Sequence, residues 1–288
     1  MKQLEIRKRL ANRVLEALRN GVPPWRSNNR GIPTNPQSGR KYTGINPLIL
    51  DAVADKEFFR SKYWATYHQW QLLGCQVPKR PDESEFGINI VNWQPFIKGR
   101  DKGDIISLER FHLLQTYPVF NAEQCFGNTV GKYLIKKENI KQPNYTDIRA
   151  IVEATGAKIR HHVATQHPRY DRYPLDRIML PPKVRFVDQT QYWASILHEL
   201  AHYSERRIGW AKPIHQGELF AEIVSGYMES ELELPHDKDL TNHDKWLPVW
   251  INEIEKDPKY LFDAAAYVAK SVDWILGFTR LKLFEEGE

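Results

Sequence analysis

The chain has 288 residues, of which 41% are hydrophobic and 27% charged, a composition typical of a folded protein with one large domain or two ordinary ones. It has no apolar run of the roughly 18 residues that a membrane-spanning helix needs, and its charged N-terminus lacks the apolar segment of a secretory signal. The two cysteines, Cys75 and Cys125, show no metal-binding spacing. We therefore expect a reduced, cytoplasmic setting and no contact with a membrane.

The net charge of +5 is unevenly distributed along the chain. Residues 1–128 contain 19 Lys and Arg against 12 Asp and Glu, a balance of +7, whereas residues 129–288 contain 22 against 24. A basic first part suits a polyanionic partner such as a nucleic acid. A basic, solvated surface without such a partner fits the count equally well.

The first part of the chain, residues 1–128, is predicted to mix helices with a small sheet. An amphipathic stripe predicts a helix over residues 1–19, and the pattern is again mostly helical over residues 48–70. Between them, residues 25–46 are rich in Gly, Pro, Asn and Ser, which is typical of an ordered loop region. A short apolar run at residues 87–91 indicates a strand.

A Lys-rich stretch without apolar periodicity, residues 129–144, is the predicted linker, and the second domain is predicted to span residues 145–288. This domain is expected to pack several helices with a small sheet, so the predicted fold class is α+β with two domains. Its strands are expected at residues 158–162 and 176–180. Its helices are expected at residues 145–156, 189–207, 217–232, 244–255 and 258–278.

His198, Glu199 and His202 form a His-Glu-x-x-His pattern inside the helix predicted at residues 189–207. Positions i and i+4 share one face of a helix, so both imidazoles can bind one metal ion. The glutamate at the rim of that face can take a proton from metal-bound water, as in zinc hydrolases. The apolar neighbours of the motif favour this interpretation over a surface helix that carries two unrelated histidines.

A third protein ligand is expected, because a catalytic zinc site keeps one coordination position for water. Glu222 lies on the next predicted helix among apolar neighbours, and a buried carboxylate needs a partner. Glu218, one turn earlier, is the alternative, and we expect Glu222 because its flanks are more apolar on both sides. Either residue could instead be a solvated helix charge. The expected cofactor is one divalent metal, in the first place Zn²⁺, although such a ligand set also accepts Mn²⁺, Co²⁺ or Fe²⁺.

Two further features of a peptidase site are expected near the motif. The strand around residues 176–181 could lie at a sheet edge and bind an extended peptide, or it could be purely structural. An oxyanion stabiliser is also expected, with Tyr227 and Tyr267 as candidates between which the sequence does not select.

The first part carries a second candidate site, in and before the loop at residues 31–46. The loop combines glycines and polar side chains with two adjacent cations and an aromatic residue. Aromatic residues interleaved with cations suit single-stranded nucleic acid, because bases stack on the rings while Lys and Arg follow the phosphates. Most aromatic residues after this loop are better explained as core. The DNA contacts are predicted at Trp25, Arg40, Lys41, Tyr42 and Asn46.

Taken together, the two parts of the chain resemble the ArdC-type antirestriction proteins of conjugative plasmids, a group that includes TraC-like primases. The resemblance implies an N-terminal domain that binds single-stranded DNA, a C-terminal zincin-like metallopeptidase domain, and a role in protecting incoming plasmid DNA from host restriction. It covers nearly the whole chain. It rests on Pro24-Trp25, the segment Gly31–Asn46, Trp64, Gln69, Gly74, the His198–His202 motif, the Glu222 helix, Trp250, Leu261 and Ala264–Ala266.

This sequence departs from the family pattern in two places. Relatives usually have Val-x-Lys-Gly where this chain has Val77-Pro78-Lys79-Arg80. Gluzincin peptidases often carry an Asp four residues after the glutamate ligand, where it orients a histidine. With Glu222 as the ligand, that position is Gly226, with Ser225 beside it. Because such partners tune metal sites, metal binding is better supported by the sequence than peptidase chemistry.

The resemblance thus leads us to expect a monomeric antirestriction protein that binds single-stranded DNA and carries a gluzincin-type metal site. It would mask DNA, cleave a host restriction component as its protein substrate, or do both. Two alternatives stay open. The chain could be a DNA-binding protein with a non-catalytic metal site, or a housekeeping metallopeptidase with an accessory basic domain.

Overall fold

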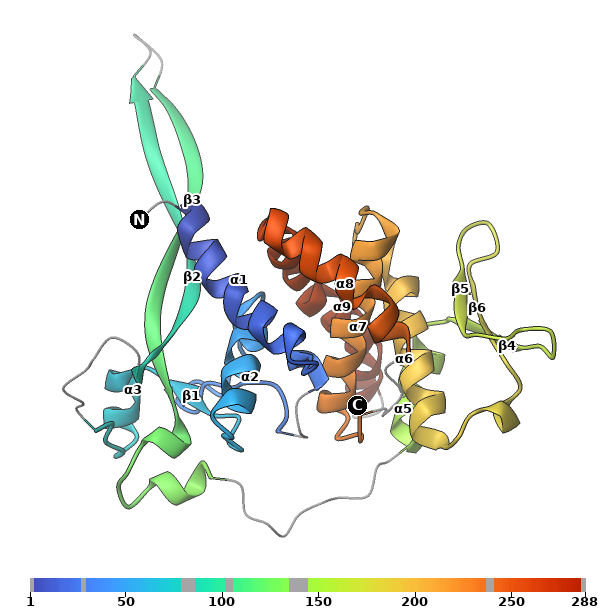
Figure 1. Ribbon diagram of the computed structural model, residues 1–288, viewed down its shortest axis with the longest axis horizontal. Helices are drawn as coiled ribbons and strands as arrows, with labels where there is room; N and C mark the ends of the chain where they lie inside the picture. Colours follow the sequence, from blue (N-terminus) through green and yellow to red (C-terminus); the bar gives the residue numbers. More distant parts are fainter. Residues whose placement is uncertain are drawn as a thin grey trace.

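The computed structural model describes residues 3–26, 30–78, 86–101, 106–134, 145–236 and 241–285. Elements from the first half of the chain pack beside a body made mostly of helices from the second half (Figure 1). Both halves contain helices and a small sheet, so the predicted α+β class is confirmed.

The first half begins with the predicted amphipathic helix, whose apolar stripe is buried. Its helices are α1 (Gln3–Arg19), η1 (Pro24–Arg26), α2 (Asn46–Lys56), α3 (Tyr67–Leu72), η2 (Ala122–Gln124) and η3 (Val130–Lys132). Its strands are β1 (Trp64–Ala65), β2 (Ile88–Asp101) and β3 (Ile106–Asn121).

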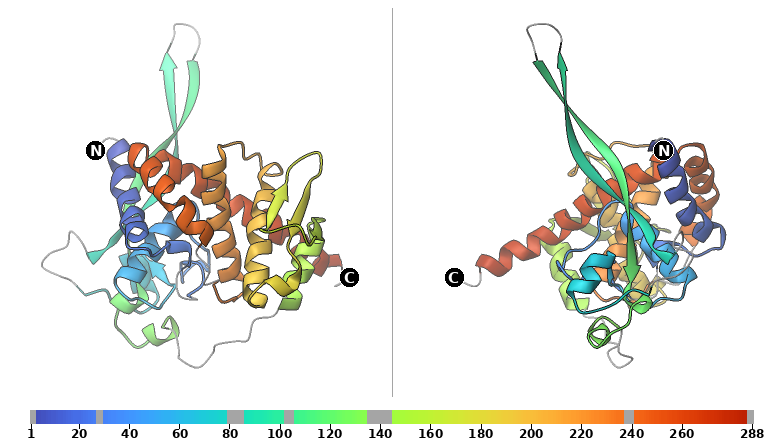
Figure 2. Two further views of the ribbon diagram at one scale, coloured as in Figure 1. Left: turned by 45° about the vertical axis from the view of Figure 1, so that its right-hand side comes forward. Right: turned by 90° about the vertical axis from the view of Figure 1, so that its left-hand side faces the viewer.

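The first sheet is antiparallel, with strand order β1-β3-β2. Strands β2 and β3 form a long hairpin that projects from the rest of the molecule (Figures 1 and 2). The strand predicted at residues 87–91 is confirmed, but β2 continues to Asp101 because β3 pairs with it along its whole length. A single local pattern does not reveal pairing of this kind.

The helix predicted over residues 48–70 is only partly correct. Helix α2 ends at Lys56, and Phe58 has a φ of 59°, a left-handed conformation that stops a helix. Trp64 then joins β1 opposite Asn121. Trp64 and Trp70 are fully buried, which confirms that these aromatic residues belong to the core.

The second half contains helices α5 (Tyr145–Ala154), η4 (Lys183–Arg185), α6 (Gln189–Glu205), α7 (Ile214–Glu231), α8 (Thr241–Lys256) and α9 (Lys259–Glu285). Its strands are β4 (Lys158–His161), β5 (Arg169–Asp171) and β6 (Arg177–Leu180). The five α-helices predicted for this half and the strands β4 and β6 are confirmed, with ends that differ by a few residues. Strand β5 was missed because it is only three polar and aromatic residues long.

The second sheet has strand order β4-β6-β5, with β4 parallel and β5 antiparallel to β6. Strand β6 is therefore paired on both sides. Of the two possibilities for residues 176–181, a sheet edge or a purely structural strand, the sheet edge is wrong, because the edges of this sheet are β4 and β5. The buried residues of β6, Ile178 to Leu180, fit its central position.

The two halves share one hydrophobic core. Leu10 and Leu48 from the first half belong to the same buried cluster as Phe220 and Trp250 from the second. A smaller cluster around Trp70 lies within the first half alone. The arrangement therefore joins α1, α2 and η1 to the C-terminal helices through apolar contacts, which tie the positions of the two halves together.

Most of the predicted linker, residues 129–144, lies outside the described residues, although Val130–Lys132 form η3. In the part of the chain that the structure describes, no helix is both long enough and apolar enough to cross a membrane.

Candidate metal centre

Helix α6 places the His-Glu-x-x-His motif at the centre of the second half. The side chain of Asp188 caps the helix by accepting a hydrogen bond from the Gln191 N–H at 2.9 Å. Four apolar residues around the motif, Ile196, Leu197, Leu200 and Ala201, have no exposed surface. This burial fixes the rotation of the helix, and the rings of His198 and His202 lie on one face with centroids 5.0 Å apart.

Glu218 on α7 faces both histidines. Its Oε2 lies 3.5 Å from His198 Nε2, and its Oε1 lies 3.6 Å from His202 Nε2. One ligand atom from each of these three residues can be chosen so that all lie within 4.8 Å of one another. Among the described residues, this is the group of His, Cys, Asp and Glu side chains whose geometry suits a metal ion.

Glu222, the expected third ligand, lies on the other side of His198. Its Oε1 is 3.6 Å from His198 Nδ1, while Glu218 occupies the Nε2 side. This geometry favours Glu218, the alternative ligand, over Glu222. Glu222 is buried, as its apolar flanks predict, but its partner is the guanidinium of Arg26, which donates a hydrogen bond to Oε2 at 3.0 Å.

With Glu218 as the ligand, the second departure from the gluzincin pattern becomes only the exchange of an Asp for a Glu. With Glu218 as the ligand, the position four residues later is Glu222, a carboxylate next to His198, and not Gly226. Gly226 has another role, because a Cβ atom there would lie 2.3 Å from the backbone oxygen of Trp25. Only glycine lets the chain at η1 approach α7 this closely.

His202 has a carboxylate partner of its own. Its Nδ1 lies 2.7 Å from Glu205 Oε1, one turn further along α6, and Arg172 donates to Glu205 Oε2 at 3.0 Å. Carboxylates that hold the outer nitrogen of a histidine fix the ring's orientation and tautomer for a metal on the other nitrogen. Both histidines therefore present Nε2 towards Glu218.

The carboxylates around His198 determine its protonation. Burial alone lowers the pKa of His198, but Glu218, Glu199 and Glu222 more than offset this effect and raise the pKa to about 9. Burial likewise raises the pKa of Glu222, and Arg26 and His198 outweigh it, so the pKa of Glu222 lies below its ordinary value. The site is thus a concentration of negative charge, which favours a cation.

Glu199 is 6% exposed, and burial raises its pKa above the ordinary value for a glutamate. A backbone hydrogen bond from Tyr170, on edge strand β5, reaches its carboxylate. The exposed edge of the sheet therefore passes beside the candidate base. A raised pKa suits a general base that must accept a proton near neutral pH.

The donor set fits a divalent metal of the zinc or manganese type. Two imidazole nitrogens and one carboxylate are the ligands of catalytic zinc sites that keep a position for water. The same set also accepts Mn²⁺ and Co²⁺. His198, His202 and Glu218 would hold the ion through Nε2, Nε2 and the carboxylate.

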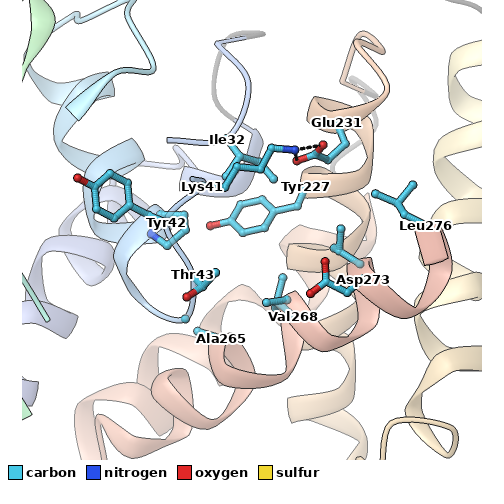
Figure 3. Close-up of a pocket in the computed structure, with 14 residues that line it drawn as sticks. Ile32, Lys41, Tyr42, Thr43, Tyr227, Glu231, Ala265, Val268, Asp273 and Leu276 are labelled. Atoms are coloured by element: carbon cyan, nitrogen blue, oxygen red, sulfur yellow. Dashed lines mark hydrogen bonds and ion pairs between the residues drawn. The ribbon is translucent and has the colours of Figure 1, made fainter. Parts of the chain in front are cut away.

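The two tyrosines considered for oxyanion stabilisation are used elsewhere. Tyr227 is buried and lines a cavity of about 100 Å³ between the loop around Tyr42 and helices α7 and α9 (Figure 3). Tyr267 packs edge-on against Trp210, with ring centroids 5.2 Å apart. Neither placement supports a role at the metal centre.

Three of the residues predicted to contact DNA have structural contacts instead. Trp25 is 1% exposed, and its ring packs against those of His243 and Trp250. The amide of Asn46 is buried, donating to the Val91 carbonyl at 2.9 Å and accepting from the Val91 N–H at 2.8 Å. The half-buried Tyr42 donates to the Trp64 carbonyl at 2.9 Å. Stacking on bases needs exposed rings, so Trp25 and Tyr42 do not offer a stacking platform in this conformation.

The two cations of the predicted DNA site are exposed. Lys41 forms an ion pair with Glu231 of α7, and both residues line the cavity in Figure 3. Arg40 lies on the exposed turn beside it. The structure thus separates the five predicted residues into a buried group and an exposed pair.

Two family models match this chain, one in each half. Residues 4–121 match the model of the N-terminal domain of the anti-restriction factor ArdC, and residues 146–267 match a zincin-like metallopeptidase model. The metal-free crystal structure of the antirestriction protein ArdC from plasmid R388 superposes with a TM-score of 0.77 at 25% identity, covering 94% of this chain and 97% of that one. The chain has the two-domain architecture of the ArdC-type antirestriction proteins.

The Mn(II)-bound form of the same R388 protein matches with a TM-score of 0.74 over 96% of this chain and 98% of that one. A DNA primase TraC from Escherichia coli is 31% identical over 96% of this chain, which spans only 27% of the primase. The uncharacterized protein y4eC of Sinorhizobium fredii is 27% identical over 94% of this chain and 91% of its own length. The chain thus spans nearly the whole length of some relatives and about a quarter of the primase.

Proposed function

We propose that this chain is an antirestriction protein that binds single-stranded DNA through its first half and a divalent metal at His198, His202 and Glu218. The single observation that carries the metal site is the convergence of these three side chains, each histidine backed by its own carboxylate. The Mn(II)-bound R388 relative supports a divalent metal at this architecture. The DNA half of the proposal rests on the ArdC N-terminal match and on the basic first half.

The roles of the residues follow from their positions. The metal, when bound, would supply Lewis acidity and lower the pKa of a bound water. Glu199, buried and with a raised pKa, would accept the proton of that water through its carboxylate. Glu222 and Glu205 would hold the histidine rings. The edge of β5 beside Glu199 would align an extended peptide by backbone hydrogen bonds.

Metal binding is tested by measuring the metal content of the purified protein and of the His202→Ala variant. The proposal expects about one equivalent of Zn²⁺ or Mn²⁺ in the wild type after loading and its loss in the variant. Equal metal content in both proteins would contradict the site.

The catalytic part is tested with Glu199→Gln, which keeps the size of the side chain and removes the base. If proteolysis underlies protection, this variant retains metal and fails to protect incoming plasmid DNA in a transfer assay into a restricting host. Full protection by Glu199→Gln would instead support a DNA-binding protein with a non-catalytic metal site.

DNA binding is tested by fluorescence anisotropy of a labelled single-stranded oligonucleotide at increasing salt. Contacts between cations and phosphates release counterions, so binding should weaken steeply as salt rises. Removing the exposed cations with Arg40→Ala and Lys41→Ala should weaken binding and reduce the salt dependence. Absence of binding even at low salt would contradict the DNA part and favour a metallopeptidase with an accessory basic region.

A further inference from the structure

Helix η1, from the first half of the chain, packs against helices α7 and α8 of the second half, beside Glu222. The ring of Trp25 lies 5.9 Å from that of His243 and 6.2 Å from that of Trp250, both on α8. The backbone oxygen of Trp25 fills the space over Gly226 on α7. Apolar burial and close backbone packing therefore fix the position of the next residue, Arg26.

Arg26 binds one carboxylate oxygen of Glu222, and the other oxygen of the same carboxylate faces the metal centre. Its Nη2 donates to Glu222 Oε2 at 3.0 Å, and Glu222 Oε1 lies 3.6 Å from His198 Nδ1. The side chains of Arg26 and Glu222 are 17% and 3% exposed. A pair so well shielded from water is fixed in geometry much more firmly than a surface ion pair.

The surroundings of Glu222 show why Arg26 is needed. A carboxylate as buried as this one is costly unless it is paired and hydrogen-bonded. His243 also faces Glu222, but both its ring nitrogens are buried without a hydrogen-bond partner, so it does not orient the carboxylate. Among the described residues, Arg26 donates the hydrogen bond that sets the direction of Glu222.

We propose that Arg26 is a positioning residue of the metal centre, which acts through Glu222 to fix the ring of His198. The first half of the chain thereby supplies part of the metal site of the zincin-like half. This inference rests on the proposed metal site at His198, His202 and Glu218. It follows that a change in the position of η1 alters metal affinity, so the two halves are coupled through Arg26.

The test is a titration of the full-length, metal-free protein with Zn²⁺ in competition with a chromophoric chelator. Loss of a residue that orients a metal ligand, as Glu222 orients His198, typically weakens metal affinity roughly 10–100-fold. Because Arg26 acts through Glu222, we expect a loss for Arg26→Ala that does not exceed that of Glu222→Ala. Arg26→Lys, which keeps the charge, should recover part of it. The matched control is Arg19→Ala, which removes the cation of an exposed ion pair between α1 and Glu255 of α8 and should bind Zn²⁺ like the wild type.

A second measurement separates positioning from a general effect on stability. The visible absorption of bound Co²⁺ reports on the geometry of the ligands, and it should change in Arg26→Ala and not in Arg19→Ala. Because Arg26 acts through Glu222, the double variant Arg26→Ala/Glu222→Ala should bind Zn²⁺ no more weakly than Glu222→Ala alone. If Arg26→Ala does not fold, Arg26→Gln takes its place with the same expectations.

The outcomes distinguish this inference from the proposed metal site. Wild-type affinity and an unchanged Co²⁺ spectrum in Arg26→Ala, or an additive loss in the double variant, would overturn the role of Arg26 while leaving the site intact. Failure of the wild type to bind Zn²⁺ or Co²⁺, or unchanged binding in His202→Ala, would instead overturn the metal site itself and the inference with it.

Discussion

The two histidines of the metal centre lie one helical turn apart, but different parts of the molecule hold them. His202 is held by Glu205 of the same helix, and Glu205 is paired with Arg172, whose side chain is 58% exposed. His198 is flanked by Glu222 of another helix, and Glu222 is paired with Arg26, which comes from the other half of the chain and is largely buried. The first arrangement is local to the zincin-like half, and the second depends on how the two halves pack.

Two histidines with similar carboxylate partners can thus depend on different parts of the fold. Two residues that are three positions apart on one helix are neighbours whenever that helix forms. A pair that joins two halves forms only when the core between them is in place. We therefore expect changes at the interface of the halves to affect His198, and changes at Glu205 and Arg172 to affect His202.

The largest expected effect is that of pH on metal affinity. The carboxylates around His198 raise its pKa to about 9 in the absence of metal, so this histidine is protonated at neutral pH, and the metal must displace that proton. Affinity should fall roughly tenfold for each pH unit below 9, or about 100-fold between pH 8 and pH 6, because one proton is released. Calorimetric titration in buffers of different ionisation enthalpy measures the proton release. No proton release at pH 7 would contradict the raised pKa.

The next largest change in Zn²⁺ affinity is expected when Glu205, the partner of His202, is removed. Glu205→Ala removes the acceptor that lies 2.7 Å from His202 Nδ1, so Zn²⁺ affinity should fall roughly 10–100-fold. The chelator competition described above measures it. Glu153→Ala, which removes an exposed glutamate of α5, is the control. A loss in the control equal to that of Glu205→Ala would show that the effect is not specific to His202.

Gly226→Ala tests whether packing between the two halves affects the support of His198. The added methyl group would lie 2.3 Å from the Trp25 backbone oxygen, so η1 must move away from α7. Overpacking of this kind lowers the free energy of unfolding by about 1–3 kcal/mol, which denaturant unfolding can measure. Zn²⁺ affinity should fall as well, because Arg26 moves with Trp25. Gly277→Ala, at a helical glycine with open space around it, should leave Zn²⁺ affinity unchanged and raise the free energy of unfolding by about 0.5–1 kcal/mol, the opposite sign from Gly226→Ala.

The smallest effect is expected at the exposed arginine. Because the side chain of Arg172 is 58% exposed, water and salt screen its pair with Glu205. Such pairs typically contribute about 0–1 kcal/mol, so Arg172→Ala should weaken Zn²⁺ binding by no more than about fivefold. If Arg172→Ala weakened binding as strongly as Arg26→Ala, the distinction between the two supports would be lost.

The sequence predicted those parts of the site that depend on one helix alone. The spacing of His198 and His202 specifies a shared face without any tertiary information, and Glu199 follows from the same motif. Glu218 and Glu222 are also one turn apart, so helical periodicity does not separate them. Apolar flanks favoured Glu222, and the structure shows that they reflect burial against Arg26, nearly two hundred residues earlier in the chain.

Features that depend on long-range packing were predicted less well. Trp25 is an aromatic residue next to a polar loop, which is typical of a residue that stacks on bases. Its contacts with Gly226 and Trp250 instead bury it in the shared core. Likewise, residues 176–181 form a recognisable strand, whereas its central place in the sheet depends on the short strand β5. In both cases the local sequence pattern describes the segment itself, but it does not predict which other segments pack or pair with it.

The central claim is that Glu218, and not Glu222, completes the ligand set. Comparing the metal content of the Glu218→Ala and Glu222→Ala variants tests this claim directly. Both proteins would be loaded with Zn²⁺, desalted and assayed together with the wild type. We predict that Glu218→Ala loses the metal, because its carboxylate faces both Nε2 atoms. Glu222→Ala should keep the metal with weakened affinity. Full metal in Glu218→Ala together with none in Glu222→Ala would contradict the account.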